Sequence, residues 1–166
     1  NNSEFIELMD YISKADDQSL FSHIILRELR DVLREFNGKV NKEKLEKDVK
    51  TLVKVVGTLE DTPVPLVSGS YISVLIVRAG KLEKVMLEER GRYVNFIQIH
   101  LQRHPNLRRV YLISAGAIIR DITKKLIDYV TNNVADLEFV DQVTYRARIY
   151  RGIPHMPRLV ALFERK

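Results

Sequence analysis

The alternation of apolar and polar positions changes character along the chain, and residues 108–133 show this most clearly. The segment RRVYLISAG is an apolar run rich in β-branched and aromatic residues, which is typical of a strand buried on both faces. The next segment, AIIRDITKKLIDYVTNN, places its apolar residues at helical spacing. Small residues, Ser114 to Gly116, join the two segments. The pattern predicts a strand that turns at once into a helix, which is a unit of a layered fold.

Three helices are predicted before residue 60, over residues 3–13, 19–36 and 42–56, because apolar residues recur there at helical spacing. Asn37-Gly38 is expected to end the second helix, since both residues tolerate the left-handed conformation. Asn41 is expected to cap the third, with Val40 and Leu45 spaced as a hydrophobic staple.

From Leu66 the period of the pattern switches from that of helices to that of strands. Residues 71–77 and 82–87 are predicted to form a β-hairpin around a turn at 79–81. A helix over 93–103 should end at His104-Pro105. After the central strand and helix, residues 136–150 are expected to form one strand, or two with a bulge near Asp141, and residues 158–163 should close the sheet.

The order ββαβαββ predicts an α+β or α/β fold, with a mixed sheet of about five strands and packed helices after a three-helix N-terminal segment. Two prolines in residues 60–65 suggest a boundary there. We expect an acidic helical segment over 1–60 and a basic sheet domain over 66–166, although an ordinary loop within one domain remains an alternative. The predicted core contains Ile24, Leu29, Val53, Leu75, Ile97, Leu112, Ile122 and Leu126.

Composition narrows the class of protein. The chain has 166 residues, of which 45% are hydrophobic and 30% charged, as in globular proteins. The absence of cysteine excludes disulfides, thiolate metal sites and a cysteine nucleophile. No apolar run is long enough to cross a membrane, so we expect a cytoplasmic protein with no membrane partner. The chain begins with Asn, so a longer parent protein remains an alternative.

Charge is distributed unevenly. Residues 1–62 hold 10 Lys/Arg and 13 Asp/Glu, whereas residues 63–166 hold 17 Lys/Arg and 9 Asp/Glu. Arginine outnumbers lysine by 12 to 5 in the second part. The planar guanidinium group of arginine binds phosphate through two hydrogen bonds better than the lysine ammonium group does. Such an imbalance suggests either an anionic partner or docking of one half on the other.

Arginines interleaved with tyrosines are the strongest candidate site. Arg146 and Arg148 are predicted to share one strand face with Tyr150, a pattern that suits phosphate contacts combined with base stacking. The alternatives are a solvated face that keeps the protein soluble, or ion pairs to the acidic helices. The full set of candidate nucleic-acid-binding residues is Arg146, Arg148, Tyr150, Arg151, Arg90, Arg92, Arg108 and Arg109.

Other candidate sites have weaker patterns. The Ser114–Gly116 turn could bind an anion at a helix start, but it lacks the glycines and lysine of a nucleotide loop. His100 and His104 have metal-ligand spacing, and His155 could be a third ligand only if the fold brings it near them. Asp136, Glu138 and Asp141 lie near a strand start without a distinctive arrangement. We therefore expect no catalytic residues, no cofactor and no metal.

The order of hairpin, helix, VYLISAG and second helix over Leu66–Asn133 is similar to the second half of actin-like ATPase folds, including pilus-assembly members. The nucleotide-binding glycine pair and phosphate-loop aspartate of that family are not matched, so the resemblance implies a fold and not ATP binding. The same order also resembles the middle domain of peptide release factors. The two resemblances point to different families, so neither identifies the chain.

These observations predict a non-enzymatic nucleic-acid-binding module, for RNA or another single strand rather than for duplex DNA. One alternative is a protein-interaction or assembly module, with a protein partner or a homo-oligomer and a degenerate actin-like fold. A metal-dependent nuclease is the other alternative, so the sequence leaves open whether the chain is an enzyme.

Overall fold

The computed structural model describes residues 18–57, 64–150 and 152–166. The chain divides into two compact units. The first contains residues 1–59 and 67–73, and the second contains residues 60–66 and 74–166. The chain therefore passes between the units more than once around residues 60–73. The helix predicted over residues 3–13 lies outside the described part of the chain.

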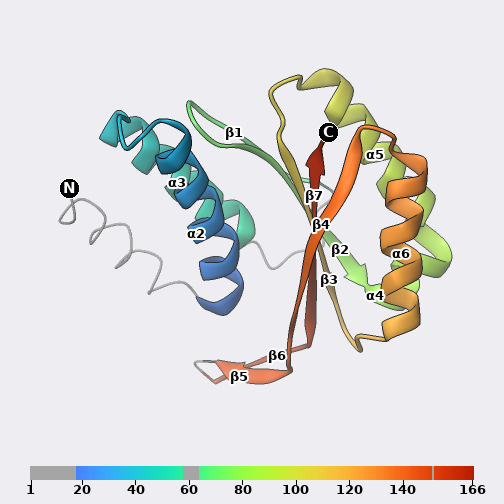
Figure 1. Cartoon of the computed structure of the whole chain (residues 1–166). Helices are drawn as coiled ribbons and strands as arrows, with labels where there is room; N and C mark the ends of the chain where they lie inside the picture. Colours follow the sequence, from blue (N-terminus) through green and yellow to red (C-terminus); the bar gives the residue numbers. More distant parts are fainter. Residues whose placement is uncertain (1–17, 58–63, 151) are drawn as a thin grey trace. The chain divides into compact units, whose positions relative to one another are not determined.

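The first unit contains a pair of helices, α2 (Gln18–Glu35) and α3 (Lys42–Val56), drawn in blue and teal in Figure 1. Asn37 and Gly38 end α2 with positive φ angles of 51° and 74°, so the predicted stop is confirmed. Asn41 caps α3, because its side chain accepts a hydrogen bond from the Lys44 amide at 3.1 Å. Local sequence signals thus determine both ends of this helix connection.

A buried carboxylate ties α3 to the turn over residues 69–72, within the same unit. Asp48 is only 5% exposed. Its carboxylate accepts hydrogen bonds from the backbone amides of Ser70 (3.2 Å), Tyr71 (2.7 Å) and Ile72 (3.0 Å). These bonds satisfy both the charge and the amide donors, which would otherwise be costly to bury.

A mixed sheet, most of which belongs to the second unit, has the strand order β1-β2-β3-β7-β4. Strands β2 and β3 are parallel, while β7 runs antiparallel to β3 and β4. The α+β prediction with five strands is confirmed. The strands are β1 (Leu66–Ser68), β2 (Ser73–Lys81), β3 (Arg109–Ala115), β4 (Leu137–Tyr145) and β7 (Arg158–Arg165), with a separate pair, β5 (Arg148–Tyr150) and β6 (Ile153–His155).

Helices cover one face of this sheet (Figure 1). They are α4 (Leu82–Lys84), a π-helical turn (Val85–Glu89), α5 (Arg90–Arg103) and α6 (Arg120–Asn133). All strand residues of β3 except Ala115 are buried, which confirms that the central strand is buried on both faces. Of the eight predicted core residues, seven are buried and Ile122 is partly buried.

The C-terminal strand also secures the end of α5. The helix ends before His104, as predicted. The Arg165 guanidinium donates hydrogen bonds to the carbonyl oxygens of Leu101 (3.1 Å), His104 (2.9 Å) and Leu107 (2.8 Å). Carbonyls at a helix C-terminus lack partners within the helix, and a cation stabilises them.

The predicted hairpin strand over residues 82–87 is wrong, because the chain there is helical. Leu82, Val85 and Met86 are all buried. Their spacing of i, i+3 and i+4 places them on one side of a helix. The short apolar run fits both a strand and a helix by its sequence, and packing on the sheet selects the helix.

Two further details differ from the sequence expectation. The bulge predicted near Asp141 is confirmed by a register shift between Phe139 and Asp141, but the strand is also interrupted at residues 146–147. The second difference is at Gly116, which has a φ of 94° and is followed by three residues before α6 begins. The strand therefore does not turn at once into the helix.

Candidate functional site

Residues 146–157, which we call the arm, carry the arginines Arg146 and Arg148 that the sequence singled out. Here β5 pairs with β6 in a two-stranded sheet of their own, beyond the ends of β4 and β7 (Figure 1). Arg146 is exposed in the break between β4 and β5, and Arg148 is half-buried on β5 opposite His155. The two arginines therefore do not share a strand face, contrary to the sequence prediction.

The arm also exposes large apolar side chains. Ile149 is 75% exposed, Ile153 is 51% exposed, and Met156 is exposed as well. Ile149 lies opposite Pro154 in the pairing of β5 with β6. The side chain of Tyr150 and the whole of Arg151 lie outside the described residues. Cations beside exposed apolar side chains on a ribbon of two strands can contact an anion and an apolar surface together.

The base of the arm is attached to the loop that follows β3. The Gly116 amide donates a hydrogen bond to the Pro157 carbonyl oxygen at 2.9 Å. A Cβ atom added to Gly116 would lie 3.6 Å from the Met156 methyl group and 3.5 Å from Cγ of Lys81. This close approach, together with the positive φ, accounts for the glycine at this position.

The Ser114–Gly116 turn does not have the geometry of a helix-start anion site. Helix α6 begins at Arg120, and the Gly116 amide already has a carbonyl partner. Ser114 is fully buried, and its hydroxyl has no hydrogen-bond partner among the described residues. A nearby hollow of about 460 Å³ has Lys81, Lys84, Glu83 and Glu88 among its lining residues. Equal numbers of cations and anions give it no preference for an anionic ligand.

Arg90 and Arg92 lie on the helical layer, in the first turn of α5. The Arg90 guanidinium stacks over the Tyr129 ring, 4.7 Å from its centroid. Arg92 forms an ion pair with Glu89 at 2.9 Å. The first contact holds the Arg90 side chain against α6, and the second holds the Arg92 side chain against the preceding π-helical turn.

Arg108 and Arg109 lie at the far end of the sheet from the arm. Arg109 pairs with Glu164 at the start of β3, whereas Arg158, which follows the arm, pairs with Ala115 at its end. Seven residues of strand separate these ends by about 20 Å. Arg109 is only 6% exposed and forms an ion pair with Glu164 at 3.1 Å. The structure thus does not bring the predicted arginines together into one surface.

His100 and His104 stack on each other, with ring centroids 5.7 Å apart. Burial, and then the positive charges of His104 and Arg103, lower the pKa of His100 below its usual value. Within residues 18–57, 64–150 and 152–166, no group of three or more His, Asp or Glu side chains is arranged to hold a metal ion.

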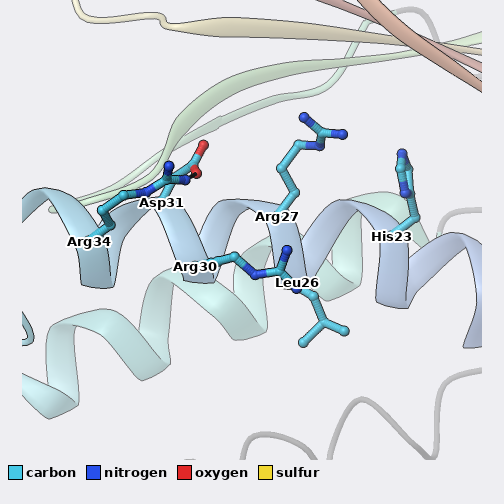
Figure 2. Close-up of a pocket in the computed structure, with 6 residues that line it drawn as sticks. All are labelled: His23, Leu26, Arg27, Arg30, Asp31 and Arg34. Atoms are coloured by element: carbon cyan, nitrogen blue, oxygen red, sulfur yellow. Dashed lines mark hydrogen bonds and ion pairs between the residues drawn. The ribbon is translucent and has the colours of Figure 1, made fainter.

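A second cationic feature, which the sequence analysis did not select, lies on α2 in the first unit. His23, Arg27, Arg30 and Arg34 recur at intervals of four, three and four residues, and therefore lie on one side of the helix. With Leu26 and Asp31 they line a hollow of about 410 Å³. In Figure 2 the Arg27 side chain extends away from the helix, the Arg30 side chain lies along it, and Arg34 lies beside Asp31, with which it forms an ion pair.

The signal for this feature was present in the sequence but was masked by counting charge over a long segment. Residues 18–57 contain nine Lys/Arg and six Asp/Glu, so the helix pair is basic. The acidic balance of residues 1–62 comes from residues 1–17, with five Asp/Glu and one Lys, and from Glu60 and Asp61.

Comparisons with models of known protein families, with curated proteins and with solved structures gave no match. Among the helices of the described residues, none has the length and apolar content needed to span a membrane.

Proposed function

We propose that this chain is a nucleic-acid-binding module that acts through the arm and carries out no chemistry of its own. The observation that supports the proposal is the combination of Arg148 with exposed Ile149 and Ile153 on one small pair of strands, next to exposed Arg146 in the connection from β4. Arginines can contact phosphates, and apolar side chains can contact the faces of bases.

A single strand, such as RNA, is the ligand that best fits this combination. Bases in a duplex are stacked and present only their edges, whereas a single strand presents base faces to apolar and cationic side chains. Exposed Ile149 and Ile153 lie on the same pair of strands as Arg148, and apolar side chains that gather on a surface can mark a binding site.

Binding of a labelled single-stranded RNA across roughly 50–200 mM salt tests the proposal. The logarithm of affinity should fall linearly with the logarithm of salt concentration, by about 0.7 for each phosphate contact. Arg146→Ala and Arg148→Ala should each flatten the slope by about one contact. Lys124→Ala is the matched control, because Lys124 is an exposed cation on α6 that pairs with Asp128 at 3.3 Å.

Arm variants that bind RNA with the slope of the parent chain would refute the assignment of the arm. Equal competition by polyglutamate and by unlabelled RNA would indicate an acidic protein partner instead, because a polyanion without bases would then satisfy the site. The melting temperature of each variant verifies that it is folded, and it should be unchanged in Arg146→Ala because an exposed charge contributes little to stability.

A second candidate function, protein assembly, is supported by the edge of the sheet. Strand β4 is the last strand in the sheet order, and Phe139 and Val140 on it are each 39% exposed. An open edge with apolar side chains can pair with a strand of another chain. Val140→Lys should then abolish any concentration-dependent increase in mass measured by light scattering. A mass that stays monomeric in the parent chain at all concentrations would exclude assembly of this chain with itself.

A further inference from the structure

We infer that the arginine side of α2 is a second phosphate-binding surface, which contacts the backbone of the same class of ligand as the arm. The inference rests on the proposed nucleic-acid function. Its residues are Arg27, Arg30 and Arg34, with His23 one turn before them. They belong to the helix pair and not to the sheet unit that carries the arm.

Charge at the hollow on α2 favours an anionic ligand. Its lining contains three arginines and only one carboxylate, Asp31, which is engaged by Arg34. Arg30 is exposed, and the Arg34 side chain is 73% exposed. A polyanion can therefore reach both guanidinium groups without unfolding any part of the helix.

The spacing of the arginines suits a chain of phosphates better than a single anion. Arg27 and Arg34 are seven residues apart, which is about 10 Å along the helix axis. Even at the close spacing of a helical strand, about 3.4 Å of axis per phosphate, that length faces about three phosphates. Arg30 lies between these two arginines on the same side of the helix, and Figure 2 shows the Arg27 side chain extending away from the helix and the Arg30 side chain lying along it. A strand that lies along the hollow can therefore contact the guanidinium groups one after another.

The type of cation differs between the two helices of the pair. All three arginines of residues 18–57 lie on α2, and all six lysines lie after it. Either residue keeps a surface soluble, but the guanidinium group offers the planar fork that binds phosphate through two hydrogen bonds. The segregation of arginine to the helix that bears the hollow favours recognition over solubility.

The lysines of α3 provide an internal contrast. Lys47, Lys50 and Lys54 also line a hollow, of about 430 Å³, but two glutamates share it. Lys50 pairs with one of them, Glu46, at 3.3 Å. Interleaved carboxylates at this surface repel a polyanion, so α3 is the matched control for α2.

The experiment measures salt dependence of binding to the same labelled single-stranded RNA, with the full chain throughout. Arg30→Gln and Arg34→Gln should each make the slope shallower by about 0.7, which corresponds to the loss of one phosphate contact. Lys50→Gln should leave the slope unchanged, although it removes the same charge from the same unit. The double variant Arg30→Lys/Arg34→Lys should keep the slope, because the charge remains, and should bind more weakly, because the fork is lost.

The outcomes separate this inference from the proposed function. If the dependence on salt becomes shallower in the arm variants but not in the α2 variants, the inference is overturned and the arm proposal is intact. If the dependence on salt becomes shallower in the α2 variants alone, the inference is supported and the assignment of the arm as a binding site is refuted. Equal effects of Arg30→Gln and Lys50→Gln overturn the inference, since general charge would then account for binding. An absence of RNA binding, or equal competition by polyglutamate, overturns both.

Discussion

At the scale of single residues, the features that could be predicted from the sequence are those whose interactions are local. The Asn37-Gly38 stop and the Asn41 cap depend on atoms within four residues, so their chemistry is evident from the sequence. Asp48 is different. Its partners lie 22 to 24 residues further along the chain, and nothing near Asp48 in the sequence indicates them.

The hydrogen bonds between Asp48 and the turn over residues 69–72 predict that substitutions at Asp48 and Gly69 have non-additive effects on stability. Asp48→Ala should lower the free energy of unfolding by about 1–3 kcal/mol, because the buried Ile72 amide loses its acceptor. Gly69→Ala should also destabilise the protein, since a Cβ atom there would overlap the Asp48 carboxylate. The same Gly69→Ala change in the Asp48→Ala background should cost much less, because the overlapping group is gone.

Chemical denaturation of the two single variants and the double variant gives the three values needed. Glu46→Ala is the control, since its partly exposed carboxylate pairs only with an exposed lysine. Additive effects of the two substitutions would show that Gly69 and the Asp48 carboxylate are not in contact.

His100 leads to a prediction about pH. Its pKa is lowered in the folded protein, mainly by burial and then by His104 and Arg103, while in the unfolded chain it is near 6.5. Between these values the unfolded state binds the proton and the folded state does not. The contribution of neutral His100 to the free energy of unfolding is therefore fully present above about pH 6.5, and it is lost as the pH decreases towards the pKa of His100 in the folded protein.

Denaturation at about pH 7.5 and about pH 5.5 measures this loss. In His100→Gln, which does not titrate, the difference in unfolding free energy between the two pH values should be smaller than in the parent chain. An equal difference in both proteins would mean that other groups determine the acid sensitivity.

At the scale of elements, long periodic segments were predictable and short ones were not. The helices α2, α3 and α6 have apolar patterns long enough to show a period of 3.6 rather than one of two. The central β3 has no alternation, and its continuous run of β-branched and aromatic residues indicated a buried strand instead. The six residues from Leu82 to Leu87 are too few for that distinction. Their helical state is decided by burial of Leu82, Val85 and Met86 in the core beside the sheet.

The assignment of residues 82–89 to helix predicts a large effect on stability for one leucine and almost none for another. Leu112, at the centre of β3, is fully buried, so Leu112→Ala should lower the free energy of unfolding by about 2–5 kcal/mol. Leu87, on the π-helical turn, is 68% exposed. Leu87→Ala should change stability by less than about 0.5 kcal/mol. A large loss of stability in Leu87→Ala, measured by denaturant midpoint, would place that segment in the core and contradict the helix.

At the scale of the whole molecule, the sequence could not predict how the chain distributes itself between its units. Residues 67–73 belong with the helix pair although they follow the two prolines, because tertiary hydrogen bonds to Asp48 hold the turn there. Charge counted over 62 residues likewise concealed a basic helix pair. In both cases a boundary drawn along the sequence does not coincide with a boundary between structural elements.

The arm allows a prediction that separates electrostatic from apolar binding in the intact protein. Ile149 is three-quarters exposed, so Ile149→Ala should leave the melting temperature unchanged. If its side chain lies against a base, the substitution should weaken RNA binding by up to about 2 kcal/mol, at about 0.8 kcal/mol per buried carbon group. The salt slope should stay that of the parent chain, because no phosphate contact is removed.

Arg146→Ala should show the converse pattern, with a flatter salt slope and an affinity that approaches that of the parent chain as salt increases. Titrations of both variants and the parent at two or more salt concentrations provide the comparison. An Ile149→Ala variant with unchanged affinity would mean that the arm contacts only the phosphate backbone. Discrimination between a single strand and a duplex would then have to come from another part of the chain, since phosphates occur in both.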